Sequence, residues 1–570
     1  MGYREYMAER QGFEPWMPFR AYTLSKRAPS ATRPSLRTVA GARSTASKGE
    51  ARYLQSNMRA PLDRGLPPFA ARRRGAAAEA TYNKRTVMSA DPEIPIPQFE
   101  SQEIPVPADA HAAEVFDERS GEVHLGEELR ALLALAIPVV LSELGWMTMT
   151  IVDLIMVGRL GPAAIGAVGL GNAIYYAPSL FGIGLLLGLD TLVSQSWGAR
   201  RYDDCHRSLA QGVYIAAAFT PLLMVAMVGA QWIFTGRGVD PIVAGMTRGY
   251  VMWLNWGTFP LLVYGGFRRY LQGVGRVRPV AFALITANLV NLAGNWVLIY
   301  GHLGFPAMGV RGSALSTCAA RVYMAGVLVY AAWAHESDRG HALFAHWPAP
   351  DWARIRALLA LGVPAASQVV LEVAAFGAAT VMASHLGPIA LATHEIVLSC
   401  AAYTYMVPLG ISAAAAVAVG HALGAGNPAR ARRAGTLAIA LGVGFMGCMA
   451  VLLITLPRAI IGIWTHDAQV LALGAHILAI VAGFQIFDGT QSVSTGALRG
   501  LGETRYPMLM NLAGYWFFGL PLGALLCFTF RWGLSGLWLG LTVALIAIAL
   551  LLATRWLRSS RRPAVASASA

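Results

Sequence analysis

Long apolar segments alternate with short polar connections over most of the chain and predict membrane-spanning helices. Each segment has about 20 residues or more, which suits the crossing of a bilayer. None shows the two-residue alternation of a barrel strand, and helices satisfy their own backbone polar groups in lipid. The predicted helices cover 131–157, 163–194, 208–235, 243–266, 280–301, 310–334, 355–384, 389–422, 435–464, 469–497, 507–530 and 532–556. The pattern therefore predicts an all-α polytopic membrane protein with twelve transmembrane helices.

The first six predicted helices resemble the last six at a nearly constant spacing. Leu160-Gly161-Pro162 recurs 226 residues later as Leu386-Gly387-Pro388. The other matches are Gly198-Ala199 with Gly424-Ala425, Leu271-Gln272-Gly273-Val274-Gly275 with Leu498-Arg499-Gly500-Leu501-Gly502, and Gly309 and Gly312 with Gly533 and Gly536. Six helices return the chain to its starting side, so the copies form a parallel repeat, as in secondary transporters. We expect two pseudo-symmetric six-helix bundles, at 121–345 and 346–557.

Arginines are concentrated in every second connection and indicate the orientation. The rich connections and the tail carry Arg200, Arg201, Arg207, Arg268, Arg269, Arg276, Arg278, Arg339, Arg354, Arg356, Arg430, Arg432, Arg433, Arg499, Arg505, Arg555, Arg558, Arg561 and Arg562. The opposite connections carry Arg159, Arg237, Arg311, Arg458 and Arg531. Positively charged loops stay in the cytoplasm. We therefore expect a multi-pass protein of the plasma (inner) membrane with both termini in the cytoplasm.

The composition is typical of a membrane protein, and the location of the basic residues indicates which partner they suit. The chain is 55% hydrophobic and 13% charged, with a mean hydropathy of +0.49, whereas soluble proteins are about 25% charged. The formal charge of +14 is concentrated in residues 1–90, which hold 17 Lys and Arg against 6 Asp and Glu. This placement argues against a nucleic-acid partner and favours contact with the lipid bilayer.

The two ends of the chain fall outside the repeat. Residues 1–120 are rich in Arg, Ala, Pro and Ser and predict a disordered basic extension. An alternative interpretation is a translation start at Met88, which removes most of that extension. Residues 558–570 are expected to form a cytoplasmic tail. The five cysteines are scattered without metal-ligand or disulfide spacing and are interpreted as packing residues.

Three carboxylates occur inside predicted membrane helices and are the main candidates for function. Asp153, Glu372 and Asp488 each sit in an apolar stretch, where a charge costs about 2.5–3.5 kcal/mol. Such a group either binds a cation, carries a proton, or hydrogen-bonds a neighbouring helix and merely holds the bundle together. Nearly every arginine falls in a predicted connection, so we expect no basic residue at the depth of these acids. That expectation favours a functional role.

Polar and aromatic residues share helix faces with these acids or lie near a probable cleft. Residues three, four, seven and eleven apart lie on one helix face. This spacing groups Trp146 with Asp153, Gln368 with Glu372, Gln485 and Gln491 with Asp488, and the asparagines Asn288, Asn291 and Asn295 with one another. The candidate cleft-lining residues are Gln368, Glu395, Gln485, Asn288, Asn291, Asn295, Trp146 and Tyr175. Ordinary packing is the alternative for the aromatic ones. Glu143 and Asp190 are weaker candidates, Asp190 because water is expected to reach it near a helix end.

The acids suit two coupling ions, and the residues do not separate them. Burial favours the neutral carboxyl, which loads a proton on one side and releases it on the other. Carboxylates also bind Na⁺ together with Asn, Gln, Thr and backbone oxygens. We expect coupling to H⁺ or Na⁺, no cofactor, and no metal site beyond Na⁺ at the coupling acids.

At these motifs the chain resembles the multidrug and toxic compound extrusion (MATE) family, over about residues 130–557. The motifs are Val152-Asp153-Leu154-Ile155-Met156-Val157-Gly158-Arg159-Leu160-Gly161, Ser194-Gln195-Ser196-Trp197-Gly198-Ala199, Asn291-Leu292-Ala293-Gly294-Asn295-Trp296-Val297-Leu298-Ile299-Tyr300-Gly301, and Gly496-Ala497-Leu498-Arg499-Gly500. The resemblance implies two bundles around a cleft and export of organic cations in exchange for H⁺ or Na⁺. It implies ion coupling at Asp153, Glu372 and Asp488. Gly188-Leu189-Asp190-Thr191-Leu192 is more similar to eukaryotic members.

Other functions remain as alternatives. A lipid-linked precursor flippase or a metabolite exporter of the same superfamily is the nearest one, although a flippase needs a cationic groove for pyrophosphate. A membrane enzyme is less favoured, because His302, His394, His421 and His466 form no metal-spaced cluster. The sequence therefore predicts a secondary active antiporter rather than an enzyme. We expect it to work as a monomer on small organic cations.

Overall fold

The computed structural model describes residues 125–235, 238–339 and 347–561, and this part of the chain is helical without strands. The expectations for residues 1–120 and Met88 lie outside it. The first half contains α1 (Leu125–Gly158), α2 (Pro162–Leu185), α3 (Gly188–Gly198), α4 (Tyr202–Thr235), α5 (Pro241–Asn255), α6 (Thr258–Gly273), α7 (Arg278–Tyr300) and α8 (Val310–Asp338). The predicted all-α membrane fold is confirmed.

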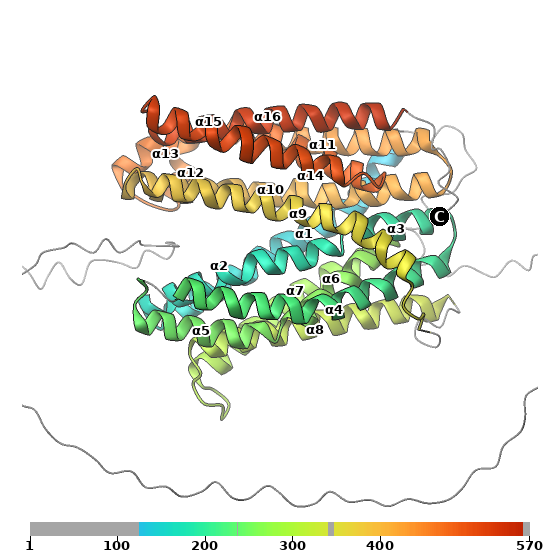
Figure 1. The fold of residues 1–570 in the computed structure, drawn as a ribbon, viewed down its shortest axis with the longest axis horizontal. Helices are drawn as coiled ribbons and strands as arrows, with labels where there is room; N and C mark the ends of the chain where they lie inside the picture. The colour runs from blue at the N-terminus through green and yellow to red at the C-terminus, as the bar shows by residue number, and fades with distance from the viewer. Residues whose placement is uncertain (1–124, 236–237, 340–346, 562–570) are drawn as a thin grey trace, which may run out of the picture. The chain divides into compact units, whose positions relative to one another are not determined.

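The second half has the same order of spans, but its second and fourth spans are unbroken helices and its penultimate span is more irregular. It contains α9 (Trp352–Ser384), α10 (Pro388–Gly424), α11 (Pro428–Thr455), α12 (Pro457–Gly462), α13 (Ala468–Gly500), α14 (Arg505–Asn511), the π-helical turns η3 (Leu512–Gly519) and η4 (Leu525–Thr529) around α15 (Leu520–Ala524), and α16 (Gly533–Ser559). Figure 1 draws α2–α8 and α10–α16 as two groups, with α1 and α9 between them.

Eleven spans in the described part are long and apolar enough to cross a membrane. The remaining predicted segment, 243–266, is divided into α5 and α6 at Trp256 and Gly257. Added side-chain atoms at Gly257 would meet Cys318 and Arg321, so α8 packs closely against this break. The prediction of one continuous helix is therefore wrong here. A break in a membrane helix is tolerated at this position, because neighbouring helices shield the irregular backbone from lipid.

The sequence repeat is also a repeat of backbone conformation. Gly161 and Gly387, which precede Pro162 and Pro388, have φ values of 105° and 102°. Residues with a side chain rarely adopt this φ, whereas glycine does so without steric cost. The proline that follows suits the first turn of a helix. Gly-Pro therefore starts the second span of each half in the same way, which explains why this pair recurs.

Apolar packing divides the described residues into two cores and a contact between them. One cluster of buried side chains belongs almost wholly to α1–α8 and a second lies in α9–α16. A third cluster joins the halves through α1, α10 and α11, and includes Leu135, Val139, Ala414 and Val417. In lipid, van der Waals packing rather than removal of apolar surface from water therefore holds each bundle together and also their contact.

Candidate functional site

Asp153 lies in a polar cluster inside the first bundle. It is 6% exposed and accepts hydrogen bonds from Asn295 Nδ2 at 2.5 Å and Thr317 Oγ1 at 3.1 Å. Asn295 Nδ2 is also 3.2 Å from Asn291 Oδ1. The cluster joins α1, α7 and α8. A buried carboxylate needs such donors, so two of the three asparagines predicted on one face are placed beside the acid.

An arginine lies near this cluster, contrary to the expectation from sequence. Arg321 is buried on α8, one turn after Thr317. Its Nη1 donates to Tyr175 Oη at 2.7 Å, and its guanidinium stacks 4.7 Å from the Tyr175 ring. Its charge also acts on the Asp153 carboxylate. The prediction that no basic residue shares the depth of the acids is therefore wrong for Asp153, because Arg321 sits inside an apolar helix and not in a connection.

Glu372 and Asp488 form a different kind of site in the second bundle. They come from α9 and α13, and their carboxyl groups lie within electrostatic range of each other. Gln491 Nε2 is 3.3 Å from Glu372 Oε2 and donates to Asn511 Oδ1 at 2.8 Å. Within the described ranges, no basic side chain is among the groups that act on either carboxyl. Two acids without a counter-charge make an arrangement suited to binding a cation or a proton.

Among the described residues, none of the other predicted site residues forms a hydrogen bond to the three acids. Asn288 donates to the Gly145 carbonyl at 3.1 Å, and Gln485 donates to Thr404 at 2.6 Å. Trp146 stacks on Tyr264 with ring centroids 6.4 Å apart. Gln368 is buried one turn before Glu372, and Glu395 is half-buried on α10. The structure thus shows polar or aromatic contacts at Asn288, Gln485 and Trp146 that hold helices together.

Sequence reasoning missed Thr317, Arg321 and Asn511. Thr317 and Arg321 are one turn apart in an apolar helix, which is a helical-face signal of the kind used for the asparagines. Asn511 lies in 507–530, beside Tyr515 in the irregular span. The sequence predicts that its partner Gln491 shares a face of α13 with Asp488. No sequence pattern, however, predicts that this face contacts α14.

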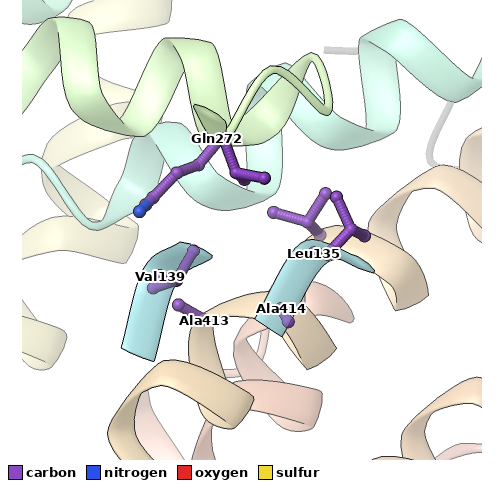
Figure 2. Close-up of a pocket in the computed structure, with 7 residues that line it drawn as sticks. Leu135, Val139, Gln272, Ala413 and Ala414 are labelled. Carbon is purple, nitrogen blue, oxygen red and sulfur yellow. The ribbon is translucent and has the colours of Figure 1, made fainter. Parts of the chain in front are cut away.

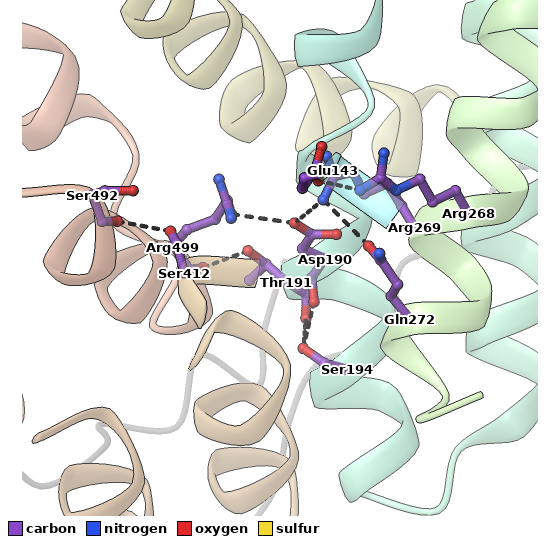
Figure 3. A network of polar contacts seen from close by, with 10 residues as sticks. All are labelled: Glu143, Asp190, Thr191, Ser194, Arg268, Arg269, Gln272, Ser412, Ser492 and Arg499. Atoms are coloured by element: carbon purple, nitrogen blue, oxygen red, sulfur yellow. Dashed lines mark hydrogen bonds and ion pairs between the residues drawn. The ribbon is translucent and has the colours of Figure 1, made fainter. Parts of the chain in front are cut away.

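A third charged cluster lies where the two halves meet, and Figure 3 shows its residues. Asp190, on α3, is 1% exposed. Its Oδ2 is 3.4 Å from Arg269 Nη1 and 3.2 Å from Arg499 Nε. Arg268 pairs with Glu143 nearby. The expectation that water reaches Asp190 is therefore wrong. Arg268, Arg269 and Arg499 were assigned to connections, but α6 and α13 extend far enough to include them.

The halves are joined at the end of the bundles that contains the connections 199–201, 274–277, 425–427 and 501–504, called here the arginine-rich end. Gln195 Nε2 donates to the Gly500 carbonyl at 2.9 Å, and His421 Nε2 is 2.6 Å from the Gly273 carbonyl. Both contacts connect helix ends of one half to helix ends of the other. The structure therefore represents a state in which this end is closed.

The closed contact encloses only a small apolar void, shown in Figure 2. This void is too narrow to admit a water molecule, and it is lined by Leu135, Val139, Gln272, Val277, Ala413, Ala414 and Val417. Pockets for drug-sized ligands have about 300–1,000 Å³. A substrate of that size does not fit between the halves at this end in this state.

Replacement of Asn295 by Leu should destabilise the first bundle. Leu has a similar volume but cannot donate to Asp153, so the buried acid loses a partner at a cost of about 1–3 kcal/mol. We expect a lower midpoint of thermal unfolding in detergent, followed by tryptophan fluorescence. Asn288→Leu is the matched control, because Asn288 is half-buried and contacts only backbone. An equal decrease of the unfolding midpoint in both variants would show that the hydrogen bond to Asp153 does not contribute specifically to stability.

Comparisons with known proteins agree with the fold and the repeat. A family model described as MatE matches residues 138–297 and 364–525, one segment in each half. A probable multidrug resistance protein NorM from Mesorhizobium japonicum is 37% identical over 442 residues, covering 76% of this chain and 95% of that protein. The multidrug resistance protein MdtK from Edwardsiella ictaluri is 32% identical over 443 residues, covering 76% and 96%.

Solved structures show the same architecture at lower identity. The eukaryotic MATE transporter AtDTX14 is similar with a TM-score of 0.69 and 22% identity, covering 77% of this chain and 98% of that one. A multidrug resistance MATE family transporter of the MOP superfamily in an outward-facing conformation has a TM-score of 0.69 and 18% identity, covering 78% and 99%. At these identities the likeness establishes the fold.

Proposed function

Since this chain belongs to the MatE family, we propose that it is a multidrug efflux transporter that exports organic cations in exchange for H⁺ or Na⁺. The observation that carries the proposal is the pair Glu372 and Asp488, which lies in a membrane bundle without a basic partner among the described residues. The names of the NorM and MdtK relatives support multidrug substrates.

Exchange follows from competition for the same negative charge. Two neighbouring carboxylates repel each other, so a proton or Na⁺ at this pair lowers the free energy of the bundle. A cationic substrate in the cleft is stabilised by the same field. Binding of one cation therefore weakens binding of the other, and this reciprocity couples their opposite movements. In this proposal Asp153 plays a different part, because it already accepts hydrogen bonds from Asn295 and Thr317 and lies within electrostatic range of Arg321.

Alternating access supplies the second element of the mechanism. The positive-inside rule places the arginine-rich end in the cytoplasm, with both termini on that side of a plasma (inner) membrane. The structure then corresponds to a state closed towards the cytoplasm. Export requires a second state in which this end opens and the opposite end closes, and ion binding shifts the population between the two. We propose that one chain is sufficient for this cycle.

Transport in proteoliposomes tests the function. Purified full-length protein is reconstituted with ethidium inside the vesicles, and efflux is followed by fluorescence under an imposed Na⁺ gradient and, separately, an imposed pH gradient. We expect one gradient to drive efflux and to identify the coupling ion. If folded protein moves no ethidium under either gradient, the cationic-drug proposal fails and a metabolite or lipid substrate becomes the better hypothesis.

A further inference from the structure

The buried charges at the arginine-rich end are divided unequally between the halves. Asp190 and Arg269 belong to α3 and α6 of the first half, whereas Arg499 belongs to α13 of the second. Figure 3 shows both guanidinium groups directed at the same carboxylate. Asp190 therefore has one partner that moves with it and one that moves with the opposite half.

This division makes the contact reversible. A buried carboxylate that loses its only partner is strongly destabilised, so a charge pair of that kind would hinder separation of the halves. Asp190 keeps Arg269 when the halves part, so only the contact with Arg499 is lost. Arg499 then lies at the newly opened end, where water solvates its charge. The cluster can thus hold the closed state without preventing the open one.

Backbone contacts align Arg499 for this role. Thr191 Oγ1, one residue after Asp190, donates to the Arg499 carbonyl at 2.5 Å. Gln195, one helical turn further along α3, donates to the Gly500 carbonyl at 2.9 Å. The end of α13 is therefore held against α3 by two hydrogen bonds from α3 side chains to α13 carbonyls, in addition to the charges. Movement of α13 breaks all these contacts together.

The same helix carries one of the acids proposed to bind the coupling ion. Arg499 follows Asp488 by 11 residues, which is close to three helical turns, so both point to the same side of α13. The rise of an α-helix separates them by about 16 Å along its axis. Tyr405, on α10, lies within electrostatic range of Glu372, Asp488 and Arg499. A rigid helix of this length can transmit a displacement from one site to the other.

We propose that Asp190, Arg269 and Arg499 form a latch that holds the arginine-rich end closed, and that α13 connects this latch to the ion-binding acids. The proposal rests on the function proposed above and adds the residues that control opening. Arg499 is a positioning residue in this scheme, because it acts through the contact between the halves. Its release from Asp190 accompanies movement of α13 when the occupancy of Asp488 changes.

A cysteine in the closed contact reports its opening. Val417 is 3% exposed and lines the small void between the halves, as Figure 2 shows for its neighbours. Val417→Cys, in the full chain with the five native cysteines replaced by Ser, should react slowly with N-ethylmaleimide. Arg499→Gln should raise the labelling rate about tenfold or more, whereas Arg499→Lys, which keeps the positive charge, should restore much of the slow rate.

The control removes a buried ion pair of similar size from one half only. The double variant Glu143→Gln, Arg268→Gln lies beside the latch but contains no contact between halves, so its labelling rate should equal that of the parent. Asp190→Asn provides a second test should Arg499→Gln fail to fold, because it leaves Arg269 and Arg499 as facing like charges and should also accelerate labelling. Unchanged labelling in folded Arg499→Gln or Asp190→Asn protein would overturn the latch.

A double-mutant cycle tests the link through α13. Asp488→Asn is combined with Arg499→Gln in the Val417→Cys background. If α13 connects the sites, the rate changes will not multiply, because both variants act on one helix displacement. Multiplying effects would overturn the link and leave the latch intact. Labelling requires no substrate, so failure of ethidium transport would count against the proposed function and leave this test of the latch unaffected.

Discussion

Replacement of Glu372 by Gln, or of Asp488 by Asn, is expected to abolish gradient-driven efflux, with a loss of about 100-fold or more in initial rate. Each amide preserves the size of the side chain but cannot bind a cation by charge or carry a proton. A neighbouring negative charge strengthens the binding of a cation to a carboxylate. Once that charge is removed, the affinity of the remaining carboxylate for a cation falls as well. The rate of ethidium efflux under each imposed gradient is the measurement.

The matched control is Glu503→Gln in the same half. Glu503 is bonded to Arg555 and its side chain is 29% exposed, so loss of its charge should change efflux little. Asp153→Asn should have an intermediate effect, because donors and Arg321 already surround that acid. Efflux at the parent rate in Glu372→Gln or Asp488→Asn would remove the pair from the mechanism.

Replacement of Gly198 or Gly424 by Ala should prevent full closure of the arginine-rich end. These glycines are equivalent in the sequence repeat, and each packs against the other half. An added Cβ would lie 2.1 Å from the His421 carbonyl oxygen at Gly198 and 2.0 Å from that of Gln195 at Gly424. Backbone atoms cannot move aside as a flexible side chain does, and overpacking of this kind costs about 1–3 kcal/mol.

That cost corresponds to a factor of about 5 to 150 in the population of the closed state. Faster labelling of the Val417→Cys reporter and slower ethidium efflux should therefore occur together. Gly444→Ala and Gly447→Ala are the controls, because an added Cβ at either position meets nothing within 4 Å. If all four variants behave alike, helix propensity rather than the contact between halves explains the effect.

The role of these glycines illustrates how far the repeat could be interpreted from the sequence. Gly198-Ala199 and Gly424-Ala425 were evident as a matched pair. The reason why they recur could not be predicted, because each glycine packs against the equivalent segment of the other half. Gln195, three residues before Gly198, is the neighbour of Gly424, and His421, three residues before Gly424, is the neighbour of Gly198. Approximate two-fold symmetry produces this exchange, and it exists only in the folded chain.

The fold class, the duplication and the acids could be predicted from the sequence, because each depends on local physics. Apolar length decides whether a segment can span lipid, and a carboxylate within such a segment is conspicuous on its own. Helical periodicity also placed Asn291 and Asn295 on one face, where the structure finds them beside Asp153.

Which charges meet depends on how the helices pack. Arg269 and Arg499 are 230 positions apart, and both contact Asp190 because α3, α6 and α13 converge at one end. In the same way, hydrogen-bond donors and the nearby charge of Arg321 surround Asp153, whereas Glu372 and Asp488 have no basic partner in the described chain. Electrostatic interactions depend on distance in space and on burial, and neither is encoded in separation along the chain. The difference between a compensated acid and an uncompensated pair is therefore a property of the packed bundles.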